Sequence, residues 1–201
     1  IMTRKTTAEV SRTTAKLTSQ HGLIYNDLLQ KFGAEKAKCY YQANQDALER
    51  YAALAKTVDC DFQRQDNMVY AADFTDSLVK EMAALDELGI PADFVDHMDL
   101  PVKTAGGIRF RHQAQFHPLK FAAGICRDLR IFEQTTAREF AGNTAVTDRG
   151  RITAKKIIVT THFPMNNKHG AYYLKMYQSR SYVLALENAT KVDGMYVDEN
   201  D

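Results

Sequence analysis

The chain has 201 residues, of which 45% are hydrophobic, and a formal net charge of +1. This size suits one large or two small domains with an ample core, and a charge near zero excludes an overall field that draws the protein to nucleic acid or a membrane surface. No apolar run is long enough to span a membrane. Three scattered cysteines without a CxxC pair (Cys39, Cys60 and Cys126) indicate reduced core thiols in a cytoplasmic protein.

Residues 11–22 read SRTTAKLTSQHG, a polar stretch that we interpret as a loop leading into a helix near Leu23. Its hydroxyl, amide and basic side chains, together with the N–H groups of the first helical turn, would suit an anion. A solvated N-terminal tail with a Ser or Thr cap explains the same residues, and composition alone favours that simpler interpretation.

The next hundred residues predict three helices and two strand regions. Apolar spacing indicates a helix that ends at Gly33 and a longer one whose apolar stripe we expect to face the core: Ala37, Tyr40, Tyr41, Ala47, Leu48, Tyr51, Leu54, Ala55 and Val58. Residues 62–70 predict a hairpin that turns near Gln65, Asp66 and Asn67. A third helix ends at Gly89 and should face inward with Leu78, Val79, Met82, Leu85 and Leu88. A short strand is predicted at residues 92–95.

The rest of the chain is mostly β. Ile108, Phe110 and His112 alternate with polar neighbours, which predicts a strand over residues 107–116 with these three on one face. A helix should begin at Pro118. We then expect short strands at 131–134, 137–140 and 144–147, a hairpin turn at 148–150, a return strand at 151–154, a buried strand at 155–160, and strands at 182–186 and near the end. This order predicts an α+β fold with some α/β character, not a simple doubly wound sheet.

Few side chains indicate chemistry on their own. We expect no metal site, because His112 and His117 lack a third ligand nearby. His162 either places an imidazole in a cleft at the end of a strand or caps the backbone. Arg109 and Arg111 suit a substrate carboxylate, the solvated face of a sheet or, with their aromatic neighbours, single-stranded nucleic acid, which we consider the least favoured. No GxSxG, P-loop, HExxH or GxGxxG motif is present.

Two regions together resemble a known family. RTTAKLTSQHGLIYNDL at residues 12–28, and later FHPLKF, VTDRGRITAKKIIVTTHFP and YQSRSYVLALENA, are similar to FAD-dependent oxidoreductases of the D-amino-acid oxidase (DAO) superfamily. The bacterial glycine-oxidase-like members, some of which carry an extra Rieske iron–sulfur domain, resemble the chain most. The family's GxGxxG unit precedes the hydroxyl-rich loop and a glycine-rich segment follows later, so this chain looks like an internal fragment that lacks both.

The resemblance implies a domain organisation. A cofactor-contacting loop of the FAD-binding domain would occupy residues 1–22, followed by substrate-domain helices and strands at 23–116, a further segment of the FAD-binding domain at 117–165, and substrate-domain strands at 166–201. The whole would be part of an FAD-binding domain interleaved with a substrate domain built from a mixed sheet plus helices. The substrate-domain sheet would cover the flavin.

The resemblance also implies site residues. Candidates for FAD contacts are Arg12, Thr13, Thr14, Ala15, Lys16, Thr18, Gln20, His21, Gly22, Thr160, Thr161 and His162. Weaker candidates for facing the substrate are Tyr177, Arg180 and Tyr182. No catalytic side chain is assigned, because a neutral amine can lose a hydride directly to the flavin.

The function implied is oxidation of an amine or amino acid by hydride transfer to FAD, in the cytoplasm of a bacterium. One alternative is a flavin dehydrogenase that passes electrons to an iron–sulfur centre. Another is a catalytically inert binding fragment, because the glycines that bring a backbone close to the pyrophosphate are missing. The expected partner is a small-molecule amine or amino acid, without nucleic acid or a membrane span, and we expect the fragment to self-associate through exposed core surface.

Overall fold

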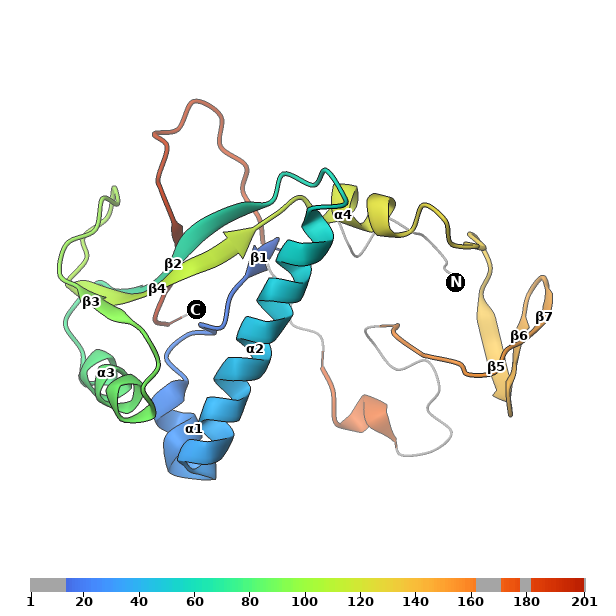
Figure 1. The fold of residues 1–201 in the computed structure, drawn as a ribbon, viewed down its shortest axis with the longest axis horizontal. Coiled ribbons are helices and arrows are strands. Elements are labelled where there is room, and N and C mark those ends of the chain that lie inside the picture. The colour runs from blue at the N-terminus through green and yellow to red at the C-terminus, as the bar shows by residue number, and fades with distance from the viewer. Residues whose placement is uncertain (1–13, 162–170, 178–181, 201) are drawn as a thin grey trace. The chain divides into compact units, whose positions relative to one another are not determined.

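The computed structural model describes residues 14–161, 171–177 and 182–200. They fall into two compact units (Figure 1). The larger unit contains residues 14–127 and 190–200, and the smaller unit contains the described residues between 128 and 189. The division of the chain into cofactor-binding and substrate segments at residues 22, 116 and 165 stays a prediction.

The larger unit is built on a five-stranded mixed sheet. Its order is β1 (Lys16–Leu17), β4 (Gly106–Gln115), β2 (Gln63–Ala71) and β8 (Met195–Asp198), and β3 (Asp93–Val95) also pairs with β4. β2 runs antiparallel to β4 and parallel to β8. The predicted α+β class, with a mixed sheet plus helices, is confirmed.

Three helices lie on one side of β2 and β4: α1 (Tyr25–Phe32), α2 (Ala34–Ala55) and α3 (Asp76–Leu88) (Figure 1). The core between helices and sheet includes Tyr25, Leu78, Leu85, Ile108 and Phe110, each at most 1% exposed. The ring of Tyr25 stacks on that of Phe110 with centroids 5.9 Å apart. This contact joins α1 to the centre of the sheet.

Local signals predicted the helix ends well. Gly89 ends α3 in the left-handed conformation, with φ +64°, as expected of a glycine C-cap. Pro118 opens α4 (Pro118–Ile125), and His117 Nδ1 accepts a hydrogen bond from Lys120 N at 3.4 Å. The inward prediction for α3 is wrong for Val79, which is 51% exposed.

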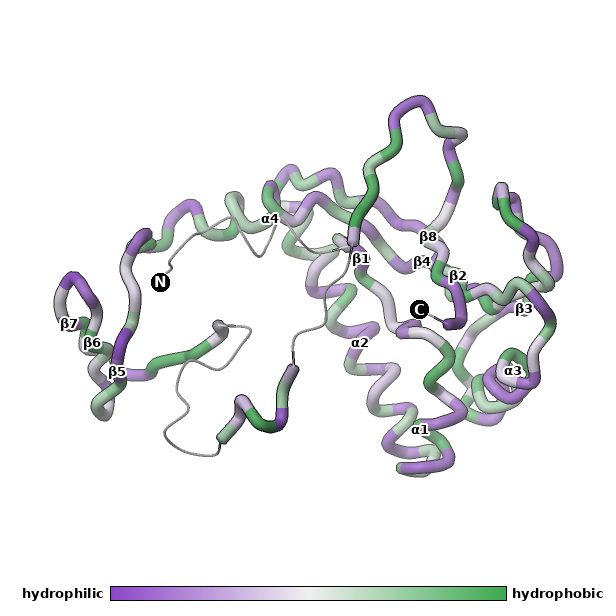
Figure 2. Tube along the Cα trace, turned by 180° about the vertical axis from the view of Figure 1, so that it is seen from behind, coloured by the Kyte–Doolittle hydropathy of each residue, from purple (hydrophilic) through white to green (hydrophobic). Residues whose placement is uncertain are grey.

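The core-facing prediction for α2 is wrong over much of its stripe. Of the residues in α2, Ala37 and Leu48 are buried, whereas Leu54 is 48% exposed and Ala47 is also exposed. Figure 2 shows hydrophobic positions on α2 only at intervals along a largely hydrophilic helix. Tyr51 packs at the margin, against Phe116 and Phe121. Only a narrow stripe of α2 contacts the core. The apolar spacing therefore predicted more buried residues than the helix has.

The cysteines occupy three environments, and the description as core thiols holds for one of them. Cys60 is 1% exposed, and its burial raises the pKa of its thiol. Cys126 is partly buried, and Cys39 is exposed on α2. The core prediction for Cys39 is wrong because its helix packs less deeply than its apolar spacing indicates.

The predicted hairpin at residues 62–70 is a single strand, β2. Its supposed turn residues lie opposite an irregularity in the neighbouring strand, where Gln65 pairs with Gln113 but Asn67 pairs with Phe110. Arg111 and His112 together therefore face Asp66 alone, which is a β-bulge in β4. His112 adopts φ +58° there. A bulge changes the apolar alternation much as a turn would, which explains the wrong prediction.

The smaller unit contains the predicted meander of β5 (Ala137–Ala141), β6 (Thr144–Thr147) and β7 (Gly150–Thr153), with the turn at residues 148–150. The unit also contains a short 3₁₀ helix, Tyr172–Leu174.

Three predicted strands are wrong. Residues 131–134 form only an isolated bridge, and residues 155–160 and 182–186 form no strand. Ile158 is 84% exposed and Val183 is 82% exposed. A strand needs a neighbouring strand for its backbone hydrogen bonds, and within the described ranges no strand pairs with residues 155–160 or 182–186.

Candidate functional site

The hydroxyl-rich segment is partly a strand. Lys16 and Leu17 form β1 and pair with Gln115 and Ala114 of β4. Just before them, Ala15 O accepts a hydrogen bond from Phe116 N at 3.2 Å. Part of the segment predicted as an irregular loop therefore forms a short edge strand. It does so because the edge of β4 offers unpaired backbone groups at this point.

The following residues, 18–22, are held by buried amide side chains of the sheet. Ser19 N donates to Gln113 Oε1 at 2.8 Å. Gln20 Nε2 donates to the carbonyl oxygen of Ile108 at 2.9 Å, and Gln20 Oε1 accepts from Asn67 Nδ2 at 2.7 Å. Ser19 and Gln20 are 0% and 2% exposed. Both residues are therefore committed to the sheet.

Two more hydrogen bonds shape this loop. Tyr25 Oη donates to the carbonyl oxygen of Ser19 at 2.6 Å, and Gln20 N donates to Thr18 Oγ1 at 2.9 Å. Burial is the main cause of a strongly raised pKa of Tyr25, so its hydroxyl stays protonated and remains a donor. The loop backbone is thus bound on both sides by groups that do not titrate near neutral pH.

His21 stands at the exposed end of the loop. Its Nδ1 lies 2.8 Å from Tyr40 Oη. Burial and, secondarily, the charge of Lys16 lower the pKa of His21 below its ordinary 6.5. The imidazole is therefore mainly neutral at pH 7. A neutral ring at this position presents a hydrogen-bonding nitrogen without a charge.

A cavity of about 440 Å³ lies against the sheet. Met68 and Arg109 line it, and they alternate along their strands with the buried Val69 and Ile108. Because alternate strand residues face opposite ways, this cavity lies on the face that the helices leave open. Its other lining residues include the charged side chains of Arg64, Asp66, Asp99 and Asp193.

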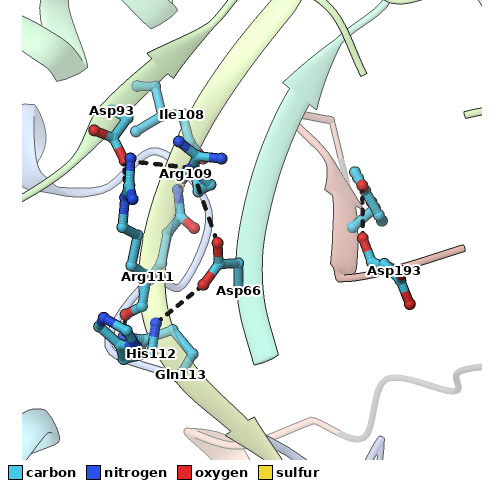
Figure 3. Close-up of polar contacts among 10 residues, drawn as sticks. Asp66, Asp93, Ile108, Arg109, Arg111, His112, Gln113 and Asp193 are labelled. Carbon is cyan, nitrogen blue, oxygen red and sulfur yellow. Dashed lines mark hydrogen bonds and ion pairs between the residues drawn. The ribbon is translucent and has the colours of Figure 1, made fainter. Parts of the chain in front are cut away.

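Two arginines and two aspartates form an ion-pair cluster beside the cavity (Figure 3). Arg111 Nε lies 2.6 Å from Asp93 Oδ2, and Arg109 Nε lies 3.3 Å from the same oxygen and 3.9 Å from Asp66 Oδ2. The Arg109 side chain is 30% exposed. Both arginines use Nε in these contacts.

The cluster predicts a specific pH dependence. The hydrogen bond from Arg111, helped by Arg109, lowers the pKa of Asp93 below its ordinary 3.8. Its stabilising contribution is therefore complete above pH 3.8 and is lost as the pH falls through the lower folded-state pKa. Asp93→Asn should lower the free energy of unfolding by less than about 1 kcal/mol near pH 7. Urea denaturation from pH 2 to 7 would show the difference from wild type vanish at the acid end.

Asp96→Asn is the matched control for this prediction, since Asp96 is exposed shortly after β3. It should leave the free energy of unfolding unchanged. An Asp93→Asn difference that persisted undiminished at pH 2 would contradict the ion-pair explanation.

The remaining predicted site residues are spread over the chain. Thr160 and Thr161 are exposed residues of the smaller unit. Tyr177 and Tyr182 lie in the same unit and are 90% and 86% exposed. Arg12, Thr13, His162 and Arg180 lie outside the described residues. The contacts predicted for these residues with FAD or substrate stay predictions. The structure brings residues 14–22 together with β4.

Sequence reasoning missed Asn67 and Gln113, both at most 1% exposed. A long polar side chain at an inward strand position was the available signal, because buried polar groups need partners. Also missed were Asp66 and Asp93, which position the two arginines. No metal-binding group of three or more His, Cys, Asp or Glu occurs within residues 14–161, 171–177 and 182–200. Across the same ranges, no helix has the length and hydropathy of a membrane span.

The chain is similar to a known protein family and to a curated bacterial protein. Residues 7–200 match the family model DAO, described as FAD dependent oxidoreductase. The chain is 31% identical over 201 residues to the "Putative Rieske 2Fe-2S iron-sulfur protein YhfW" of Bacillus subtilis (strain 168). That match covers 93% of this chain and 40% of the relative. The chain thus spans well under half the length of this curated relative.

Solved structures give the same fold. Glycine oxidase from Geobacillus kaustophilus has a TM-score of 0.54 at 15% identity, over 77% of this chain and 46% of that one. L-proline dehydrogenase from P. horikoshii has a TM-score of 0.53 at 12% identity, over 72% of this chain and 40% of that one. At such identities the likeness concerns the fold alone.

The loop geometry is compatible with the cofactor of this family. Ser19 and Gln20 are turned into the sheet, so the loop backbone is fixed in place, while Thr14 and His21 are exposed. A loop backbone held in this way, with a neutral imidazole and the Thr14 hydroxyl at its surface, suits a large ligand bound through several hydrogen bonds. The residues present therefore fit one wall of an FAD site.

Proposed function

The chain belongs to the FAD-dependent oxidoreductase (DAO) family, and we propose that the whole protein oxidises an amine or amino acid by hydride transfer to a bound flavin. FAD would be held by the candidates in residues 12–22 and 160–162, with Gln20 contributing through its backbone because its amide is occupied. The flavin, when bound, supplies the hydride acceptor. The residues of this chain would bind and orient the substrate and keep the loop rigid.

The observation that carries the proposal is the charged cavity on the open face of the sheet. An amino acid presents a carboxylate and an ammonium group, and this cavity offers Arg109 for the first and Asp66, Asp99 and Asp193 for the second. The Nη donors of Arg109 suit a two-pronged contact with a carboxylate. Tyr177, Arg180 and Tyr182 stay weaker candidates for substrate contact.

The full-length protein tests the proposal. After incubation with FAD and desalting, it should keep the flavin absorption band, and anaerobic addition of its amino-acid substrate should bleach that band. A panel of amino acids and of matching amines without the carboxylate identifies the substrate class. Absence of bound flavin, or no bleaching by any member of the panel, would contradict the proposal.

Substitution of the arginine in the cavity gives a second test. Arg109→Met should raise KM for a substrate that carries a carboxylate by roughly 10- to 100-fold, as loss of charge-assisted hydrogen bonds does. KM for the amine without a carboxylate should change little. Lys103→Met, which removes an exposed positive charge paired with Asp73, serves as the control. An equal rise in KM for both substrates would contradict a role of Arg109 in carboxylate recognition.

A second function is favoured by the relative named as an iron–sulfur protein. In this alternative the reduced flavin passes its electrons to an iron–sulfur centre instead of oxygen. The measurement is the rate of flavin reoxidation with oxygen and with a one-electron acceptor such as ferricenium. Rapid reoxidation by ferricenium and slow reoxidation by oxygen would favour the dehydrogenase.

A catalytically inert role is the second alternative. In this role the chain would keep the fold but bind no flavin. We would then also expect self-association through exposed apolar residues such as Ile158 and Val183. Light scattering on the desalted protein, beside its absorption spectrum, distinguishes this outcome. A colourless oligomer would favour it over both enzymatic functions.

A further inference from the structure

The β-bulge in β4 is held from the neighbouring strand on both sides. His112 N donates to Asp66 Oδ1 at 3.1 Å, and Arg64 Nη1 donates to the carbonyl oxygen of His112 at 2.9 Å. Figure 3 shows Asp66 between the bulge and Arg109. Asp66 and Arg64 thus satisfy the backbone groups that the extra residue removes from the ladder.

The bulge reverses which side chain points to the helices. Simple alternation would place His112 beside Phe110, but His112 is exposed and Gln113 is 1% exposed in its place. Because one extra residue inverts the facing of all that follow it, the bulge is what brings an amide into the buried layer at this point.

Gln113 then uses both ends of its amide. Nε2 donates to the carbonyl oxygen of Arg111 at 2.8 Å, across the bulge. Oε1 accepts from Ser19 N at 2.8 Å. One side chain therefore connects the backbone that carries Arg111 to the backbone of the loop at residues 18–22. Gln113 is almost fully buried, so water does not easily replace either hydrogen bond. Breaking one of them should therefore lower stability.

We propose that Gln113 is a positioning residue that fixes the FAD-contacting loop relative to Arg109, which lines the cavity. The inference rests on the proposed function, because that function assigns FAD to the loop and substrate to the cavity. Gln113 touches neither ligand. Its role is to set the place of Ser19, and with it the backbone of Gln20 and His21, against the strand that carries Arg109 and Arg111.

Gln113→Met in the full-length protein removes both hydrogen bonds at nearly constant volume. The dissociation constant for FAD, measured by flavin fluorescence, should rise about tenfold, and the amide of Ser19 should exchange its hydrogen faster. The matched control is Gln115→Met on the same strand, which breaks only the bond from Gln115 Nε2 to Gln63 Oε1. It should change neither quantity.

Gln113→Glu supplies a second, pH-dependent readout, which is compared with the free energy of unfolding of the same variant at each pH because a buried carboxylate also destabilises the fold. A protonated carboxyl offers one donor and one acceptor, as the amide does, whereas a carboxylate has no donor for Arg111 O. FAD affinity of this variant, relative to wild type at the same pH, should therefore recover as the pH falls from 8 to 5.5. It also decides the matter if Gln113→Met fails to fold.

The outcomes separate the two proposals. Wild-type protein that binds no FAD overturns the proposed function and this inference with it. Wild type that binds FAD, with Gln113→Met within twofold of Gln115→Met, overturns the inference alone. Weak FAD binding by Gln113→Glu that stays the same at both pH values also overturns it.

Discussion

Replacing Gly107 with alanine is expected to lower the free energy of unfolding by about 3 kcal/mol or more, at or above the upper end of what overpacking usually costs. Gly107 lies in β4 opposite Tyr70 of β2. A Cβ at this position would come within 2.5 Å of the Val69 carbonyl oxygen and 2.9 Å of Tyr70 Cα, and would also meet the Met98 side chain. Backbone atoms cannot turn away as a side chain can, so the two central strands must separate.

Urea denaturation measures this effect, with Gly89→Ala as the control. Gly89 has φ +64°, and a methyl group added there would meet nothing within 4 Å. Gly89→Ala should therefore lower the free energy of unfolding only by the cost of a left-handed backbone, about 1–2 kcal/mol. If Gly107→Ala cost no more than Gly89→Ala, the close approach of β2 and β4 at Gly107 would be refuted.

Removing the carboxylate of Glu81 should have the second large effect. Glu81 lies on α3, is 2% exposed, and accepts from Tyr25 N and Asn26 N at 2.8 Å each. It thereby caps α1, whose own N-cap residue Ile24 provides no side-chain bond. Glu81→Ala leaves one buried and one partly buried N–H group unpaired, which should cost about 2–5 kcal/mol. Glu81→Gln keeps one acceptor oxygen and should cost about 1–2 kcal/mol.

The pH dependence of this site has a definite sign. Burial raises the pKa of Glu81 above its ordinary 4.5, although the N–H groups of Asn26, Tyr25 and Ile24 act in the opposite direction. The folded state therefore holds the proton more tightly than the unfolded state. The free energy of unfolding of wild type, relative to Glu81→Gln, should fall as the pH rises from 4.5 through the higher folded-state pKa, and then level off.

Denaturation of both proteins at pH 4 to 8 measures the difference. Asp86→Asn, on an exposed position of the same helix, controls for general effects of charge and should give no such slope. A relative stability that increased with pH over this range would mean that the hydrogen bonds to the carboxylate outweigh its burial.

Local sequence signals determined the elements whose ends depend on a single residue. Gly89 ended α3 because glycine alone adopts the left-handed backbone at little cost. Pro118 opened α4 because it needs no N–H partner at the first helical position. Short alternating segments around residues 148–150 predicted the meander of β5, β6 and β7. The motif at residues 12–28 indicated the family, which the match over residues 7–200 confirms.

Only the tertiary structure decided which residues meet across long distances in sequence. Ser19 and Gln113 are 94 positions apart, and Glu81 caps a helix that begins 56 positions earlier. The bulge at Arg111 and His112 exists because β2 pairs with β4 in a shifted register, and no local pattern distinguishes that from a turn. Side-chain alternation reports the backbone period, whereas burial and hydrogen bonding depend on the neighbour that the fold supplies.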